Sequence, residues 1–155
     1  MKRILLTGMS GVGKSTVLSL LRDEHTMCID LDETNFVEID FETGERQICV
    51  DQLISYMKTI SDKDVVIAVC EANQHLVYPM MNKIILLTAP IEVMKERIKV
   101  RKNNNYGKTS EDWEKIVRDK IDIEPLLRKG ADYVIQTDRE LEGIIEKIKL
   151  IITNA

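Results

Sequence analysis

The chain has 155 residues, of which 44% are hydrophobic and 31% charged, and its formal net charge is −4. This size and composition predict one globular domain over residues 1–155. The acidic balance argues against a nucleic-acid partner, and no apolar run approaches the roughly 20 residues that a membrane helix needs. Three cysteines without a metal-binding spacing favour a reducing, cytoplasmic location.

The most informative stretch lies near the N-terminus. A short apolar run at residues 4–7 predicts a strand, and apolar residues from Val17 to Leu21 have helical spacing. Between them the chain reads Gly8-Met9-Ser10-Gly11-Val12-Gly13-Lys14-Ser15-Thr16. This is the phosphate-loop pattern G-x-x-x-x-G-K-[ST], with the strand before it and the helix after it that the pattern requires.

The chemistry of phosphate binding accounts for these residue types. Glycines let successive main-chain N–H groups point at phosphate oxygens, and the N-terminus of the following helix adds partial positive charge. Lys14 can reach the β- and γ-phosphates, Ser15 is the expected Mg²⁺ ligand, and Thr16 is placed to touch the α-phosphate. The alternative is a glycine-rich turn that only joins strand to helix. The Lys-Ser pair and both flanks favour a nucleoside triphosphate site.

The next segments predict a second strand and an insertion. The apolar run from Met27 to Ile29 ends in Asp30-Leu31-Asp32, and alternation places both aspartates on one face. Residues 36–49 alternate apolar and polar positions around the Thr43-Gly44 turn, which predicts an inserted hairpin. The aspartates could instead be a solvated strand end or a helix cap. Their position at a predicted sheet edge favours a functional role.

Two uninterrupted apolar runs, at residues 65–70 and 84–87, predict strands that are covered on both faces. Three polar residues follow the first run: Glu71, Asn73 and Gln74. They could form a capped turn, but their place at the end of a strand favours substrate contact.

The second half of the chain alternates in the same way. A helix is predicted after Pro90, and it carries Arg97 and Arg101 one turn apart. These arginines could belong to a solvated helix face. A polar, basic loop at residues 102–109 fits a short mobile lid. We expect Pro125 to kink or end the next helix, before a last strand at residues 133–135 and a final amphipathic helix.

Strands that alternate with helices predict an α/β fold of three layers, with a five-stranded parallel sheet and helices on both faces. Right-handed crossovers bring the carboxyl ends of the strands to one edge of the sheet, where ligands of such folds bind. The phosphate loop, Asp30, Asp32 and the polar residues after residue 70 should therefore converge there.

At this point the chain resembles the small P-loop kinases, the group that holds adenylate kinase, shikimate kinase and gluconate kinase. Gly8 to Thr16 matches their phosphate loop. Asp30-Leu31-Asp32 is similar to the D-x-D of shikimate kinase, where the first aspartate assists the magnesium shell and the second contacts the substrate hydroxyl. Arg97 to Arg101 is similar to the R-I-x-x-R helix end of adenylate kinase. The resemblance implies that Arg97 stacks on adenine and that Arg101 contacts phosphate at the base of the lid. It also places Gln136 and Thr137 in the adenine-contacting loop.

The departures from these relatives concern the acceptor. Cys70-Glu71-Ala72-Asn73-Gln74 stands where shikimate kinase has a glycine-rich turn, and Arg46 is the only arginine between residues 36 and 49. The short loop after Arg101 replaces the long lid of adenylate kinase. Neither shikimate nor a nucleoside monophosphate is therefore favoured as the acceptor.

These observations predict a phosphotransferase that moves the γ-phosphate of Mg·ATP to a hydroxyl or phosphate group of a small metabolite or nucleotide, as a monomer or a homodimer. Lys14, together with Mg²⁺ held through Ser15, would neutralise the developing charge. Asp32 would take the proton of the acceptor hydroxyl, Asp30 would hold a metal-bound water, and Arg101 would close over the phosphates. The alternative is a nucleotide-binding regulatory module or an NTPase without a small-molecule acceptor. The missing N-K-x-D motif and the arginine pair before the lid favour the kinase.

Overall fold

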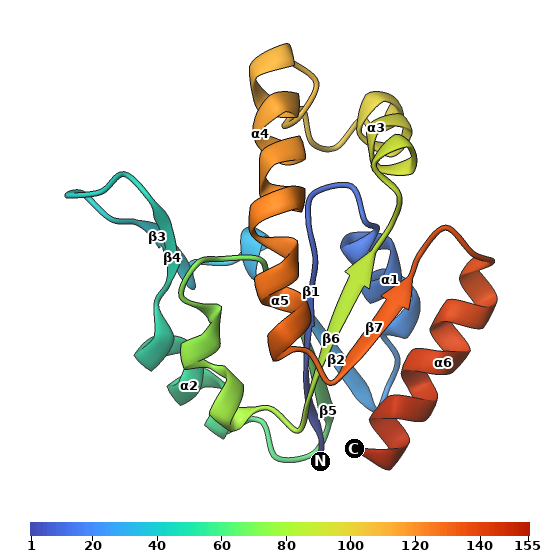
Figure 1. Cartoon of the computed structure of the whole chain (residues 1–155). Coiled ribbons are helices and arrows are strands. Elements are labelled where there is room, and N and C mark those ends of the chain that lie inside the picture. The colour runs from blue at the N-terminus through green and yellow to red at the C-terminus, as the bar shows by residue number, and fades with distance from the viewer.

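The computed structural model describes residues 1–155 and contains one parallel sheet of five strands (Figure 1). The strand order is β2-β5-β1-β6-β7, so β1 lies in the middle. The strands of this sheet are β1 (Arg3–Thr7), β2 (Thr26–Asp30), β5 (Asp64–Ala68), β6 (Lys83–Thr88) and β7 (Tyr133–Gln136). The predicted α/β fold with a five-stranded parallel sheet is confirmed.

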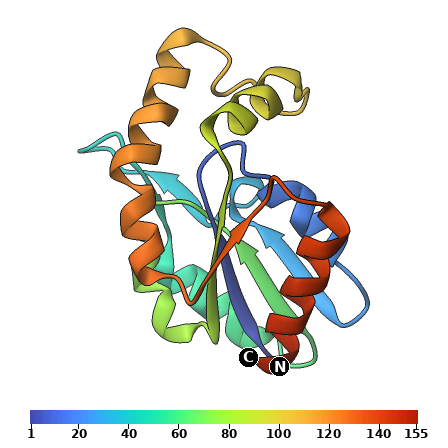
Figure 2. The same cartoon turned by 45° about the vertical axis from the view of Figure 1, so that its right-hand side comes forward.

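Six α-helices and a separate hairpin surround the sheet. The helices are α1 (Lys14–Leu21), α2 (Val50–Thr59), α3 (Ile91–Val100), α4 (Ser110–Asp122), α5 (Glu124–Gly130) and α6 (Leu141–Asn154). Three single-turn 3₁₀ helices are η1 (Leu31–Glu33), η2 (Gln74–Leu76) and η3 (Tyr78–Met80). Figures 1 and 2 show α1 and α6 on one side of the sheet and α2 and α5 on the other.

The core follows from the alternation of side chains along the central strand. Ile4 and Leu6 pack with apolar residues of α1 and α6, whereas Leu5 points to the opposite side and packs with Leu53 and Met57 of α2. All five of these side chains are fully buried. A central parallel strand must be apolar on both faces, which explains the continuous apolar runs in the sequence.

The predicted insertion is a two-stranded antiparallel hairpin, β3 (Val37–Ile39) and β4 (Arg46–Ile48), which is separate from the main sheet. Figure 1 shows it projecting from the side of the molecule that carries α2. Its turn contains Gly44, which has a left-handed φ of 70°. The hairpin tip is exposed, since Phe41 near the turn is fully accessible to solvent.

The helix end expected at Pro125 is present, and Pro125 also begins the next helix. Helix α4 ends at Asp122 before the proline, and a second helix, α5, then begins at Glu124 with Pro125 in its first turn. The missing N–H of proline costs nothing in the first turn, because that group has no intrahelical partner there. Pro125 thus starts a helix.

Candidate active site at the carboxyl edge of the sheet

The phosphate loop connects β1 to α1 at the carboxyl edge of the sheet, and its backbone depends on glycine. Gly13 has a φ of 96° and precedes the first helical residue, Lys14. A Cβ at Gly8 would collide with the main-chain oxygen of Leu87 on β6. Side chains are therefore excluded where the loop passes β6 and where it enters the helix. The local pattern G-x-x-x-x-G-K thus produces the strand-to-helix turn that it predicts.

Lys14 closes the loop on itself. Its ammonium donates to the main-chain oxygens of Gly8 and Met9, the latter at 3.2 Å. Met9 and Val12 are buried under the loop and anchor it to the core. The lysine is therefore held at the place where the loop N–H groups and the N-terminus of α1 concentrate positive charge.

Ser15 and Asp30 meet beside this loop, although they belong to different elements. The Ser15 hydroxyl donates to Asp30 Oδ2 at 3.1 Å, and Asp30 Oδ1 accepts from the main-chain N–H of Asp32 at 3.1 Å. These are hard oxygen donors, the kind that Mg²⁺ prefers. The structure contains no group of three or more His, Cys, Asp or Glu side chains that could hold a metal ion. A cation here would therefore need oxygens from a nucleotide as well.

Arg97 of α3 ties the phosphate loop to the segment after β7. Its guanidinium donates to the main-chain oxygen of Val12 at 3.2 Å, to the Thr137 hydroxyl at 2.9 Å and to the Thr137 main-chain oxygen at 2.5 Å. Thr137 is buried and also donates to the Val12 oxygen at 2.7 Å. Gln136, its neighbour, is exposed. Hydrogen bonds thus connect three segments that are far apart in sequence: the phosphate loop, α3 and the segment after β7.

Arg101 lies at the C-terminal end of α3 and reaches the phosphate loop. It donates to the Ser10 hydroxyl at 3.3 Å, and to main-chain oxygens of Asn104 and Tyr106 in the following loop. Partial burial lowers the pKa of Arg101 from its ordinary value, while the nearby Tyr106 opposes this shift. Gly107 in the same loop packs against Ile98 and Ile116, so the 102–109 segment is anchored between α3 and α4.

Asp32 and Glu71 form the other side of the site, and Arg46 of the hairpin lies between them. Arg46 donates from Nη2 to Asp32 Oδ1 at 2.7 Å and from Nε to Glu71 Oε1 at 3.1 Å. The Asp32 side chain is 64% exposed, whereas that of Glu71 is only 10% exposed. Burial raises the pKa of Glu71, and the bonds to Arg46 oppose this shift. Sequence reasoning did not assign a role to Arg46, because its partners are 14 and 25 positions away.

Asn73 and Gln74 come to the same edge, but their side chains are bonded within the protein. Asn73 accepts from the N–H of Ile48 at 2.9 Å and donates to the Ile48 oxygen at 3.0 Å, which fastens β4 of the hairpin to the sheet. Gln74 is 2% exposed and bonds Thr7, the N–H of Glu71 and the Tyr78 hydroxyl. Their geometry is that of structural supports, so the substrate contacts expected of these two residues find no support here.

A buried ionic cluster that sequence reasoning missed lies behind this edge. Glu124 accepts from the Thr88 hydroxyl at 2.6 Å and from Lys120 at 2.8 Å, and Arg128 also contacts it at 3.3 Å. The spacing of the three charged residues by four positions was the available signal. The cluster joins the end of β6 to the α4–α5 junction, and it holds a carboxylate that is almost fully buried.

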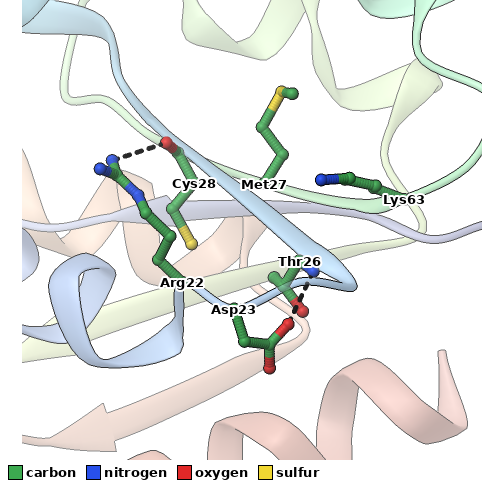
Figure 3. A pocket seen from close by; sticks show the side chains of 6 residues that line it. All are labelled: Arg22, Asp23, Thr26, Met27, Cys28 and Lys63. Carbon is green, nitrogen blue, oxygen red and sulfur yellow. Dashed lines mark hydrogen bonds between the residues drawn. The ribbon is translucent and has the colours of Figure 1, made fainter.

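The pocket in Figure 3 lies at the opposite edge of the sheet, where β2 begins. Arg22 donates to the main-chain oxygen of Cys28 at 3.0 Å, and Asp23 accepts from the N–H of Thr26 at 2.8 Å. Burial raises the pKa of the Cys28 thiol to about 11, so this cysteine is an unreactive thiol at neutral pH. The pocket therefore adds no chemistry to the site at the carboxyl edge.

Comparisons with known proteins agree with the phosphate-loop motif and the fold. The family described as "AAA domain" matches residues 4–122. A protein named "Putative adenylate kinase" from Methanocaldococcus jannaschii is 31% identical over 94% of this chain and 83% of its own length. A "Nucleotide-binding protein" from Agathobacter rectalis is 30% identical over 96% of this chain, which spans only 53% of that relative.

Solved structures show the same fold. Shikimate kinase from Acinetobacter baumannii, in complex with shikimate, superposes with a TM-score of 0.65 over 99% of this chain and 94% of its own, at 20% sequence identity. No helix here is both long and apolar enough to cross a membrane. The phosphate loop, the sheet order and these matches place the chain in the AAA domain family, among the small P-loop kinases.

Proposed function

We propose that this protein transfers the γ-phosphoryl group of ATP to a hydroxyl group of a small molecule. The observation that carries this proposal is the contact between Ser15 and Asp30 at 3.1 Å, with Asp32 two residues further on. This contact supports the proposal because Lys14, the oxygens of Ser15 and Asp30, and the exposed carboxylate of Asp32 then lie at one edge of the sheet. Residues 1–155 would act as one kinase domain, since a single sheet runs from Arg3 to Gln136.

The nucleotide would lie along the phosphate loop. Main-chain N–H groups from Met9 to Thr16 would bind the phosphates, and Arg97, Gln136 and Thr137 would border the base. The Ser15 hydroxyl and Asp30 fit Mg²⁺, because this ion takes one or two protein oxygens and completes its shell with phosphates and water. When bound there, Mg²⁺ supplies positive charge beside the β- and γ-phosphates.

The transfer needs a base and charge neutralisation. As the acceptor oxygen forms its bond to the γ-phosphorus, the bond from that phosphorus to the β–γ bridging oxygen breaks and ADP leaves. Asp32 takes the proton of the acceptor hydroxyl and later releases it to water. Lys14 balances the charge that develops on the phosphoryl oxygens, and Arg101 adds a second cation from the base of the lid. Residues 102–109 would close over the site and exclude water.

A screen of ATP consumption with pooled metabolites tests this proposal. The wild-type protein should consume ATP faster with at least one pool than without any, and the Lys14→Ala protein should not. A phosphorylated product identified by mass spectrometry then names the acceptor. If no pool accelerates consumption and the protein hydrolyses ATP at an enzymatic rate by itself, the kinase proposal fails.

A nucleotide-binding module or NTPase without an acceptor is the second candidate. It is favoured by the relatives that are named only for nucleotide binding and that extend well beyond the matched region. In that case the surface at Asp32 and Arg46 would respond to the bound nucleotide, and ATP or GTP would change the affinity for a partner. Acceptor-independent hydrolysis is the result that separates the two.

A further inference from the structure

On the acceptor side of the proposed site, an arginine of the chain itself occupies the space between two carboxylates. The guanidinium of Arg46 lies between the carboxylates of Asp32 and Glu71 and donates to both, at 2.7 Å and 3.1 Å. It comes from the hairpin, which is fastened to the sheet by Asn73 through Ile48. Arg46 thus places a planar cation with several N–H donors beside the residue that we assign as the base.

The surroundings of Arg46 are acidic. Between residues 31 and 49 the chain has six acidic residues and one basic residue, which gives a formal charge of −5 for this segment. The acidic residues are Asp32, Glu33, Glu38, Asp40, Glu42 and Glu45. Glu71 adds a further carboxylate from the sheet. An acceptor with a carboxylate or phosphate group would therefore enter against a field of its own sign.

The two bonds of Arg46 differ in how easily they can be replaced. Arg46 and Asp32 are 53% and 64% exposed, so water and salt screen their ion pair and the pair contributes little. Glu71 is 10% exposed, and a carboxylate at that depth needs a hydrogen-bond donor. A molecule that displaces Arg46 must therefore bring its own donor to Glu71, and an ammonium group provides both the donor and the charge.

We propose that Arg46 occupies the place of the acceptor's cationic group, and that the acceptor is a small hydroxyl compound carrying an amine. Its ammonium replaces the guanidinium at Glu71, and its hydroxyl lies at Asp32 for transfer. Arg46 then determines specificity by competing with weaker ligands for the two carboxylates. This inference rests on the proposed function, because it assigns the acceptor of the same site.

Three sugars that differ only at carbon 6 test the inference: 6-amino-6-deoxyglucose, glucose and glucuronate, which carry an ammonium, a hydroxyl and a carboxylate there. Each is titrated into the full chain saturated with Mg·ADP, and NMR follows the Arg46 Nε–H and the Glu71 carboxyl. The amine should bind at least about tenfold more tightly than glucose and should shift both signals, and glucuronate should bind most weakly. Mg·ATP affinity is measured separately, on nucleotide-free protein from the same preparation.

Variants sharpen the result. Arg46→Ala should tighten binding of the amine several-fold, because the internal competitor is gone, whereas Arg118→Ala, an exposed arginine of α4, should change nothing. Glu71→Gln should abolish the preference for the amine over glucose. Glucuronate binding as tightly as the amine, or no binding of any sugar to the wild-type or Arg46→Ala protein, would overturn the inference. Those results leave the kinase proposal standing if Mg·ATP still binds, whereas loss of Mg·ATP binding would refute the kinase proposal itself.

Discussion

The two halves of the site are built differently. On the nucleotide side, Lys14, Arg97 and Thr137 are bonded to main-chain oxygens of the phosphate loop, and Thr137 is buried. On the acceptor side, Asp32 and Arg46 are more than half exposed, and they meet through side chains alone. Main-chain bonds leave little freedom, whereas an exposed ion pair can exchange partners. Under the proposed function, the phosphates would therefore meet a rigid surface and the acceptor would meet an adaptable one.

The largest effect should come from the nucleotide side. Lys14→Ala removes the ammonium to which we assign charge neutralisation of the transferring group, so turnover should fall by about 10³-fold. Single-turnover transfer from labelled ATP measures it. Lys63→Ala, a lysine at the opposite edge of the sheet, is the matched control and should keep full activity. If Lys14→Ala keeps most of the wild-type rate, Lys14 does not stabilise the transferring phosphoryl group.

Asp32→Asn tests the acceptor side with a nearly isosteric change. The amide still accepts a hydrogen bond from Arg46 but takes up no proton, so the rate of transfer should fall about 10²-fold. The affinity for Mg·ATP should stay the same, as isothermal titration can show. Glu33→Gln, the adjacent exposed carboxylate, serves as control. An unchanged transfer rate in Asp32→Asn would remove Asp32 from the role of base.

Arg97→Ala should weaken nucleotide binding without touching the acceptor side. It removes charged hydrogen bonds to the phosphate loop and to Thr137. We expect the binding free energy of Mg·ATP to weaken by about 2 kcal/mol, which raises its Kd roughly 30-fold. The matched control is again Arg118→Ala. A change confined to the acceptor KM would contradict the division of the site into two halves.

Asn73→Ala distinguishes a support of the hairpin from a substrate contact. Loss of its two bonds to Ile48 should lower the free energy of unfolding by about 1–2 kcal/mol, measured by urea denaturation, and should leave the affinity for Mg·ATP unchanged. Asn105→Ala, in the exposed loop before α4, should have no effect on stability. Normal stability together with lost transfer would restore Asn73 as a substrate contact.

The smallest effect concerns the pH dependence of stability at Glu71. Burial raises the folded pKa of this carboxyl above its unfolded value, so the folded state keeps a proton that the unfolded state has lost. Stability should therefore decrease as the pH rises from the unfolded pKa to the raised folded pKa, and stay lower above it. Urea denaturation across this range should show the decrease in the wild type and not in Glu71→Gln. A stability that increases over the same interval would mean that Arg46 outweighs burial.

The sequence by itself determined the parts whose signal is contiguous. The phosphate loop, the alternation of strands and helices and the hairpin at residues 36–49 each depend on neighbours within one segment, so their patterns are legible without a fold. Asp30 could be placed beside Ser15 because parallel strands end at a common edge.

Only the tertiary structure decided which side chains face the ligand space and which face the protein. Asn73 and Gln74 carry the same polar signal as Glu71, yet their bonds run inward, to β4 and to Tyr78. The bridge from Arg46 to Asp32 and Glu71, and the bond from Thr137 to Val12, join positions 14 to 125 residues apart. The direction of a side chain depends on partners brought together by packing, and local propensity carries no information about them.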